Sequence, residues 1–281
     1  MRVNIKLFEV GHCRHCERVT LAGGGWHAIT FPSLAVLIVH PREGAILYDT
    51  GYADHFMSAT ARLPERAYRW ATPVTLPASA QLGAQLAEHG LSLGDIRYCV
   101  ISHFHADHIA GLRDLPNARF IASARDFEHV RSQSRLGGLF KGILPALLPS
   151  DFEARLQLAE QLPRRTAGSG WEELGEGWDL FGDGSVLALR LPGHAPGHLG
   201  LLLRDAQDRQ ILLCADAAWS HRAWRDLRLP SVIARPFIHD WTAYRTTLQH
   251  LRSLAARHPG LVILPSHCQE SLRAYRQGSG L

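Results

Sequence analysis

The sequence predicts an α/β protein in which two sheets pack face to face and helices cover their outer sides. Three observations support this fold class: 46% of the 281 residues are apolar, short apolar runs rich in branched residues recur, and helical patterns alternate with them. The runs expected to form strands are residues 3–8, 34–39, 45–48, 98–101, 119–122, 186–191, 199–203, 210–214 and 261–264. We expect a single domain over residues 1–281.

Two stretches, residues 79–89 and 241–258, show the three- and four-residue spacing of apolar side chains that predicts an amphipathic helix. In the second stretch we expect Asp240 to cap the amino terminus, because its carboxylate can accept hydrogen bonds from the first free backbone N–H groups. Pro259 and the glycine after it predict the end of this helix.

The segment from about residue 126 to residue 177 interrupts the regular recurrence of predicted strands, and its apolar clusters predict a helical insertion. We expect this insertion to cap a pocket. The alternative is an amphipathic helical hairpin that only covers the core.

Composition and charge limit the classes of partner and compartment. The formal net charge is +4 and the basic residues are scattered, which argues against a nucleic-acid partner. The opening MRVNIKLFEVGHCRHC lacks the apolar region of a signal peptide, and no run approaches the eighteen apolar residues of a membrane span. Five cysteines, an odd number, favour a reducing compartment, and we expect the cytoplasm.

The segment VISHFHADHIAGL, residues 100–112, places three histidines and an aspartate within six positions, directly after an apolar run. His103 and His105 are two residues apart, so they point to the same side of an extended chain. Asp107 and His108 follow where the chain is expected to turn into a helix. Imidazole nitrogens and carboxylate oxygens bind zinc and similar ions, which usually take three or four protein ligands each. The segment therefore predicts parts of two neighbouring metal sites.

Three further ligand-type residues stand at the ends of predicted strands. They are His194 in LRLPGHAPGHLG, Asp216 in ILLCADAAW and His267 in LVILPSHCQE. A single histidine in such a place is usually a surface residue or a hydrogen-bonded core residue. The combination with the histidine-rich segment favours one shared metal centre.

The motifs SHFHADHIAGL, PGHAPGHLG, CADAAW and LPSHC, in this order, resemble the signature of the metallo-beta-lactamase superfamily. The resemblance covers essentially the whole chain and implies a four-layer αββα sandwich with a metal site at one edge of its sheets. It also implies two divalent metal ions, for which zinc is the first expectation and manganese, iron and cobalt are alternatives.

The resemblance implies two sets of ligands. The first ion would be held by His103, His105 and His194, and the second by Asp107, His108 and His267, with Asp216 bridging both. In ILYDTG, Asp49 stands where the family places a carboxylate that holds a ligand histidine in one tautomer. The alternative role for Asp49 is that of a turn former before Thr50.

Asp216 also indicates which branch of the superfamily the chain resembles. Beta-lactamases of this family tend to carry cysteine or no bridging ligand there, whereas glyoxalase II-type thioesterases, acyl-homoserine lactone lactonases and phosphodiesterases keep the aspartate. The sequence and spacing around PGHAPGH are most similar to those of the lactonase branch. That branch carries a tyrosine three residues after the aspartate, but this chain has Trp219, which donates one hydrogen bond and accepts none. We hypothesise that His221 or Tyr52 supplies the missing donor.

The resemblance implies a hydrolase in which a hydroxide bridging two metal ions attacks the carbonyl of a lactone, ester or thioester. Asp107 would also carry the proton to the leaving group. The residues expected to contact this small-molecule substrate are Phe104, Trp219, His221 and Trp26. The alternatives are a phosphodiesterase of the same superfamily and a non-catalytic signalling or binding module that holds the metals. A homo-oligomer is compatible with the sequence.

Overall fold

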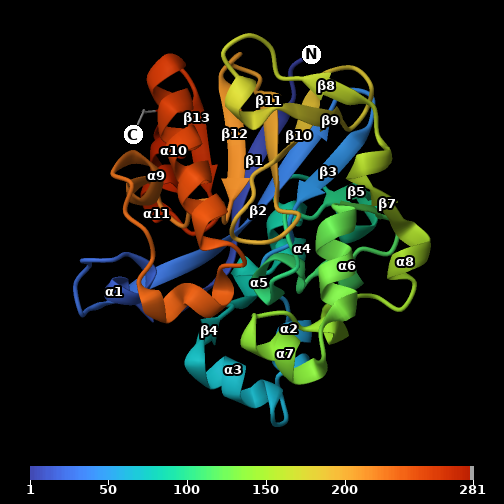
Figure 1. Cartoon of the computed structure of the whole chain (residues 1–281). Coiled ribbons are helices and arrows are strands. Elements are labelled where there is room, and N and C mark those ends of the chain that lie inside the picture. The colour runs from blue at the N-terminus through green and yellow to red at the C-terminus, as the bar shows by residue number, and fades with distance from the viewer. Residues whose placement is uncertain (279–281) are drawn as a thin grey trace.

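The computed structural model describes residues 1–278, which form two β-sheets packed between outer helices (Figure 1). The strands of the seven-stranded sheet lie in the order β4 (Val74–Thr75), β1 (Asn4–Cys16), β2 (Ala28–His40), β3 (Gly44–Tyr48), β5 (Ile96–Val100), β6 (Arg119–Ala122) and β7 (Leu156–Leu158). Those of the six-stranded sheet lie in the order β13 (Val262–Pro265), β12 (Gln210–Ala215), β11 (Leu199–Arg204), β10 (Val186–Arg190), β9 (Glu176–Asp179) and β8 (Arg164–Thr166).

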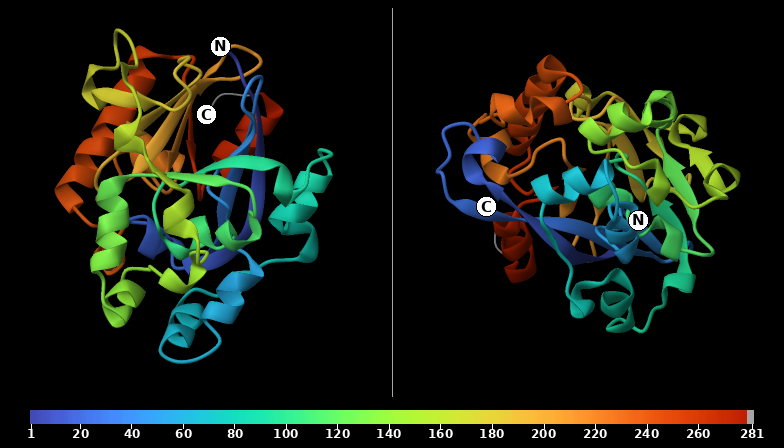
Figure 2. Two further views of the ribbon diagram at one scale, coloured as in Figure 1. Left: turned by 90° about the vertical axis from the view of Figure 1, so that its right-hand side faces the viewer. Right: turned by 90° about the horizontal axis from the view of Figure 1, so that it is seen from below.

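Helices occupy the outer sides of this sandwich and the loops at its edges (Figures 1 and 2). The α-helices are α1 (Glu17–Thr20), α2 (Asp54–Ala59), α3 (Glu65–Ala71), α4 (Leu82–Ala87), α5 (Ala106–Ile109), α6 (Ala124–Ser132), α7 (Arg135–Phe140), α8 (Phe152–Arg155), α9 (His221–Arg225), α10 (Trp241–Arg257) and α11 (Gln269–Gln277). Short 3₁₀ helices are η1 (Ala78–Ala80), η2 (Leu93–Asp95), η3 (Leu112–Asp114), η4 (Pro145–Leu147), η5 (Ala159–Gln161), η6 (Glu172–Leu174) and η7 (Val232–Phe237).

Alternation along the strands divides the core into three apolar layers, because successive side chains of a strand point to opposite faces. In β2, Leu34, Val36 and Ile38 pack between the two sheets, whereas Ala35 and Leu37 pack against the outer helices. Strand β12 divides its side chains in the same way between the inner layer and the layer under α10. The predicted four-layer αββα sandwich is therefore confirmed.

The longest helix, α10, begins where the sequence predicted. Asp240 Oδ1 accepts hydrogen bonds of 2.9 Å from the backbone N–H groups of Thr242 and Ala243. The helix ends at Arg257, one residue before the predicted end, and Pro259 follows. Its buried side chains are Tyr244, Thr247, Leu248, Leu251 and Leu254. This apolar face covers the outer side of the six-stranded sheet.

The prediction of a helical insertion over residues 126–177 is only partly right. The segment holds α7, α8 and most of α6, but it also adds β7 to the edge of one sheet and β8 to the edge of the other. All three residues of β8 are exposed, so no apolar alternation reveals this strand, and its partner β9 supplies the hydrogen bonds that extend it. The expectation of one domain over residues 1–281 stays a prediction.

No helix within residues 1–278 combines the length and the apolar character needed to cross a lipid bilayer.

Candidate metal centre

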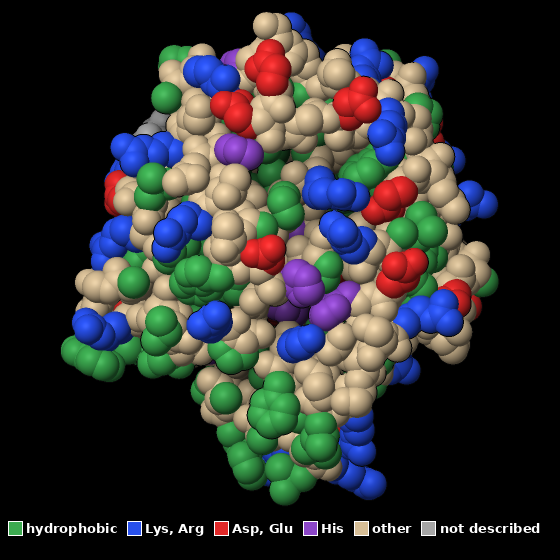
Figure 3. Space-filling view, viewed as in Figure 1, with side chains coloured by type: hydrophobic (Ala, Val, Ile, Leu, Met, Phe, Trp, Pro, Cys, Tyr) green, Lys and Arg blue, Asp and Glu red, His purple; other side chains and the backbone are tan. Residues whose placement is uncertain are grey.

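The seven predicted ligands lie together at one edge of the sheets. Figure 3 shows histidine side chains gathered in a hollow of this face, whereas the ligands His103, His108, His194 and His267 are themselves buried. Five of them stand in loops that follow a strand, and Asp107 and His108 stand on the short helix α5. Strand β5 leads to His103 and His105, β10 leads to His194, β12 to Asp216 and β13 to His267. The sheets thus deliver ligands from separate parts of the chain to one place.

The histidine-rich segment changes from extended to helical backbone at His105, which is the N-cap of α5. This change places Asp107 and His108 on the short helix, behind the extended pair. The backbone N–H of Ala106 donates to the carbonyl of Gly142, and the N–H of Thr50 donates to the carbonyl of His108. These bonds fix both ends of the turn to neighbouring loops.

The loop that carries His194 requires a glycine before it. Gly193 has a φ of +128°, and an added Cβ would collide with the backbone of Tyr244 in α10. The backbone N–H of Asp240 donates to the carbonyl of Gly193, and the N–H of His239 donates to that of His194. The start of α10 therefore sets the position of His194.

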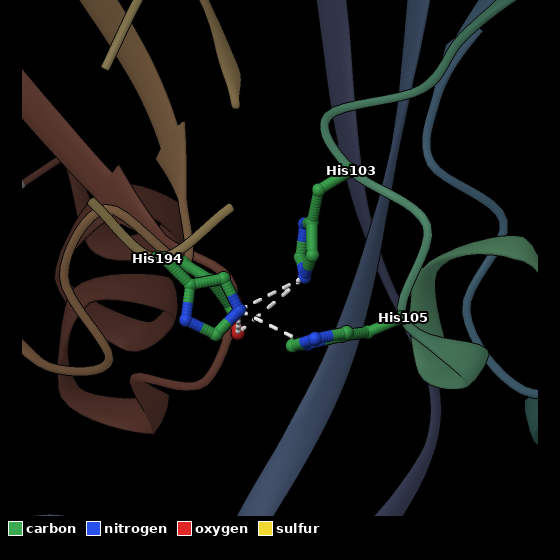
Figure 4. Close-up of side chains that lie close together, drawn as sticks. His103, His105 and His194 are labelled. Atoms are coloured by element: carbon green, nitrogen blue, oxygen red, sulfur yellow. Dashed lines mark hydrogen bonds and ion pairs between the residues drawn. The ribbon is translucent and has the colours of Figure 1, made fainter. Parts of the chain in front are cut away.

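The first cluster consists of His103, His105, His194 and Asp216 (Figure 4). His194 Nε2 lies 3.1 Å from His103 Nε2 and 3.0 Å from His105 Nδ1, and Asp216 Oδ2 lies 3.3 Å from His194 Nε2. Burial lowers the pKa of His103 and of His194 well below the ordinary value, and it lowers the pKa of His105 to about 4. All three rings are therefore neutral at pH 7 and offer a nitrogen lone pair.

The second cluster consists of Asp107, His108 and His267. Asp107 Oδ2 lies 3.5 Å from His267 Nε2 and 3.7 Å from His108 Nε2. Asp216 faces this cluster with its other oxygen, since Oδ1 lies 3.0 Å from His267 Nε2 and 3.3 Å from His108 Nε2. One carboxylate thus lies between the two clusters.

The charges of the two clusters influence each other. Burial acts to raise the pKa of Asp216, but His267, His108 and His194 hold it well below its ordinary value, so this group is a carboxylate. At His267 burial acts to lower the pKa, but Asp216 and Asp107 raise it above the ordinary value. A proton on this ring is therefore favoured until a cation takes its place.

Hydrogen bonds on the outer side of the rings determine which nitrogens face inward. His108 Nδ1 lies 2.7 Å from Asp49 Oδ2, and His267 Nδ1 lies 2.6 Å from the carbonyl oxygen of Pro32. Carboxylate and carbonyl oxygens only accept, so each Nδ1 carries the proton and each Nε2 can present a lone pair to the centre. Ser102 Oγ lies 2.9 Å from His103 Nδ1 and donates to Asp49 Oδ2 at 2.7 Å, which extends the same pattern to His103.

This arrangement fits divalent cations. His108 Nε2 and Asp216 Oδ1 are buried and have no hydrogen-bond partner within residues 1–278, although each points to the centre. Two nitrogens bound to one tetrahedral zinc ion are about 3.3 Å apart, near the nitrogen separations of the first cluster. The donor set of imidazole and carboxylate suits zinc, manganese, iron and cobalt.

The predicted substrate residues are only partly brought together. Trp219 borders the centre, but its indole Nε1 donates to Asp216 Oδ2 at 2.8 Å. Phe104 borders the cavity beside His105, and its ring packs against aromatic rings of the core. His221 contacts Cys268 and Glu270 instead of the cavity. Trp26 is not among the residues that line the central cavity; its side chain is 78% exposed in the loop after α1, beneath the Arg18 guanidinium, and its contact with substrate stays a prediction.

Sequence reasoning missed four residues of the site. Ser102 links His103 to Asp49, and buried His198 accepts the backbone N–H of Asp216 through Nε2 at 3.2 Å. Burial lowers the pKa of His198 to about 3, which keeps this acceptor neutral. Tyr68 and Phe237 line the cavity above the clusters. Only His198 had a visible signal, because it is the second histidine of PGHAPGH.

A cavity of about 90 Å³ lies over the two clusters. Its walls are mainly apolar and aromatic, and they include Val19, Phe31, Tyr52, Tyr68, Trp219, Ala234 and Phe237. Two further cavities share walls with it. One of about 260 Å³ shares Phe31 and Trp219 and reaches Arg222, and the other, of about 120 Å³, shares Phe237 and reaches Lys141.

The sequence profile of the metallo-beta-lactamase superfamily matches residues 28–267. The chain belongs to this superfamily. The match includes every one of the predicted ligands, and it confirms the resemblance drawn from the four motifs. The superfamily fold also agrees with the two sheets and outer helices described above.

Curated relatives within the superfamily include lactonases and metallo-hydrolases. An N-acyl homoserine lactonase AttM of Azorhizobium caulinodans is 27% identical over 201 residues, which are 70% of this chain and 67% of that protein. The AttM of Rhizobium radiobacter is 27% identical over 64% of this chain but only 61% of its own length. A probable metallo-hydrolase of Mycobacterium tuberculosis is 28% identical over 83% of this chain and 73% of its own.

Solved structures share the fold over nearly the whole chain. An N-acyl homoserine lactone hydrolase with N-hexanoyl-L-homoserine at its catalytic metal centre has a TM-score of 0.70 and 20% identity, covering 98% of this chain and 97% of its own. The dizinc quorum-quenching lactonase AidC has a TM-score of 0.64 and 16% identity, covering 96% and 90%. These likenesses support the fold.

Proposed function

We propose that this metal-dependent hydrolase uses two divalent cations to open the ring of a small lactone that carries an apolar acyl group. The observation that carries the proposal is the Asp216 carboxylate, whose two oxygens face two ligand clusters beneath a mainly apolar cavity. The relatives named N-acyl homoserine lactonase support the choice of substrate.

Divalent cations held by such ligands supply an ionised water at neutral pH and polarise a carbonyl oxygen. The chain's own residues hold the reacting groups around them. The Asp107 side chain faces the cavity and is not fully covered, so its carboxylate can take a proton from water and return it to the leaving alkoxide. Asp107 therefore serves in this proposal as both ligand and proton carrier.

The carbonyl of the substrate also needs a hydrogen-bond donor from the chain. Trp219 is not free for this task, because its single N–H is bound to Asp216. The Tyr52 hydroxyl is paired with the Cys13 thiol. Tyr68 lines the same cavity, and burial, followed by the charge of Asp107, raises the pKa of its hydroxyl well above the ordinary value, so the hydroxyl keeps its proton. We therefore assign the donor to Tyr68 rather than to Tyr52 or His221.

Aromatic side chains would hold the apolar part of the substrate and exclude water. Phe31 stacks on His267 with ring centroids 4.0 Å apart and meets Trp219 edge to face, while Phe237 lies opposite, near His105. An acyl chain extending from the lactone ring would pack against one of these rings.

The test is turnover of N-hexanoyl homoserine lactone by the zinc- or manganese-loaded protein, beside p-nitrophenyl acetate and bis(p-nitrophenyl) phosphate. We expect the lactone to give the highest kcat/KM, and a chelator to abolish turnover. Asp107→Asn should lower kcat by a factor of about 10² to 10⁴ because a carboxamide cannot carry the proton. Tyr68→Phe should lower kcat on the lactone. Tyr98→Phe is the matched control, because Tyr98 lies within β5, contacts Phe181 and does not line the central cavity.

Two results would overturn the proposal. Faster turnover of the phosphodiester would favour a phosphodiesterase. Absence of turnover on all three substrates, in protein with two bound ions per chain, would favour a binding module.

A further inference from the structure

A separate group of three ligand-type side chains lies beside the metal centre and has no part in the proposed reaction. His221 at the start of α9, Cys268 before α11 and Glu270 in the first turn of α11 converge on one point. His221 Nδ1 lies 3.4 Å from Cys268 Sγ and 3.2 Å from Glu270 Oε2, and the sulfur lies 3.8 Å from the same oxygen.

These three separations are close to those on one face of a zinc tetrahedron. With bond lengths of about 2.3 Å to sulfur, 2.05 Å to nitrogen and 2.1 Å to oxygen, the expected separations are about 3.5 Å, 3.4 Å and 3.6 Å for nitrogen to sulfur, nitrogen to oxygen and sulfur to oxygen. Each observed separation differs from its expected value by about 0.2 Å or less. A cation could therefore bind all three atoms with only small side-chain adjustments.

The sulfur already accepts one hydrogen bond, since the backbone N–H of His221 donates to Cys268 Sγ at 3.4 Å. A cation that binds this sulfur would displace the thiol proton. Three arginines are near: Arg222 is paired with Glu17, Arg225 is paired with Asp226, and Arg273 lines the same cavity as Glu270. A thiolate and the Glu270 carboxylate would balance the two charges of a divalent cation.

A fourth ligand position is open to water. Cys268 and Glu270 line a cavity of about 260 Å³ that also contacts His267 of the metal centre. His221 and Cys268 are buried, whereas the Glu270 side chain is 62% exposed and gives the point a path to solvent. Three protein ligands with one water is a common arrangement for zinc.

We propose that His221, Cys268 and Glu270 form a third divalent metal site, for zinc or a cation of similar softness, that joins α9 to α11. Because Cys268 directly follows His267, an ion there would also fix the backbone that carries a ligand of the main centre. The competing account is a triad held by hydrogen bonds alone, and the separations are compatible with it.

Cobalt(II) distinguishes the two accounts without reference to activity. The seven ligands of the main centre contain no thiolate, so an ultraviolet sulfur-to-cobalt charge-transfer band reports a site with cysteine. We expect the full chain to show this band at saturating cobalt and to bind one equivalent more than Cys268→Ser, in which the band is lost. Cys13→Ser and Cys16→Ser are the controls and should keep it.

Absence of the band in the wild-type chain would overturn the proposal, and so would its persistence in Cys268→Ser or its loss in Cys13→Ser alone. Glu270→Gln guards against a folding defect, because this side chain is largely exposed and its replacement leaves the core intact. Its cobalt affinity, measured by the same band, should fall at least tenfold, whereas exposed Glu153→Gln should leave it unchanged. Equal affinity in Glu270→Gln and the wild type would also contradict the site.

Discussion

Replacement of Asp49 by asparagine tests the hydrogen-bond network that orients the metal ligands. Asp49 Oδ1 accepts from the Ser102 N–H at 2.8 Å, and Oδ2 accepts from Ser102 Oγ and His108 Nδ1, each at 2.7 Å. The asparagine side chain would keep one oxygen on the Ser102 N–H and point its NH₂ group at two other donors. His108 would then have to move its proton to Nε2, the nitrogen that faces the centre.

The expected loss of metal affinity follows from this change in the tautomer of His108. Changes to a partner that orients a metal-binding histidine cost about tenfold to a hundredfold in metal affinity, or about 1.4 to 2.7 kcal/mol. The larger effect should fall on the ion bound by His108, which Asp49 contacts directly, and a smaller effect should reach the ion of the first cluster, because Ser102 links Asp49 to His103. Backbone strain does not complicate the test, since Asp49 has a φ of 59° and asparagine tolerates this left-handed conformation.

The assay is competition for zinc against a chromophoric chelator, with the number of ions per chain counted at each free zinc concentration. Asp205→Asn is the matched control, because Asp205 is also buried and accepts from the backbone of Gln207 and Arg209 but lies at the far end of β11. Asp205→Asn should bind both ions as the wild type does. Wild-type affinity for both ions in Asp49→Asn would refute the reasoning about tautomers.

Two other substitutions test the scaffold. Gly193→Ala should lower the free energy of unfolding by about 2–6 kcal/mol, the sum of overpacking against Tyr244 and of backbone strain. It should also weaken the binding of the ion held by His194. An added Cβ at Gly260 meets no neighbouring atom, so Gly260→Ala should change neither the unfolding free energy, measured by chemical denaturation, nor the affinity, measured by zinc titration. Burial raises the pKa of the Asp126 carboxyl from 3.8 to about 7, so the folded protein holds a proton there that the unfolded chain releases. The contribution of this group to the free energy of unfolding is fully present below pH 3.8. It falls by about 1.4 kcal/mol per pH unit as the pH rises from there toward about 7. The unfolding free energy of Asp126→Asn relative to the wild type should therefore rise by about 2 kcal/mol between pH 5 and pH 7, and a constant difference would contradict the assignment.

The parts of the fold that the sequence predicted are those in which local pattern and tertiary contact agree. Strands β2, β3, β6, β11 and β12 alternate or run continuously through apolar layers, so their sequence already shows which faces are buried. Strands β4, β7 and β8 have two or three residues each and lie at or near sheet edges. Their extended backbone depends on a neighbouring strand that is distant in sequence, and no local periodicity of so few residues can reveal it.

The metal ligands could be predicted because their residue types are unusual at their positions in the chain. A histidine or aspartate at the end of a buried strand is unusual, and seven of them cannot all be explained as turn formers or surface residues. The substrate wall could not be predicted in the same way, because an aromatic side chain serves equally in a core, a cavity or a loop. Trp26, which follows three glycines, is exposed to solvent and does not line the central cavity. Tyr68 lines that cavity from α3, although nothing in the sequence of this helix marks it as part of a site.

Trp219 shows how a departure from the lactonase pattern changes the role of one position. Its indole N–H is 2.8 Å from Asp216 Oδ2, the oxygen that also faces His194, so the side chain supports the carboxylate between the clusters. Its ring meets Phe31 edge to face, and Phe31 in turn stacks on His267. Because an indole has only one polar hydrogen, this support excludes a hydrogen bond to substrate. Any donor to the carbonyl must then come from another segment, which is why the proposed assignment of Tyr68 and the position of Trp219 depend on each other.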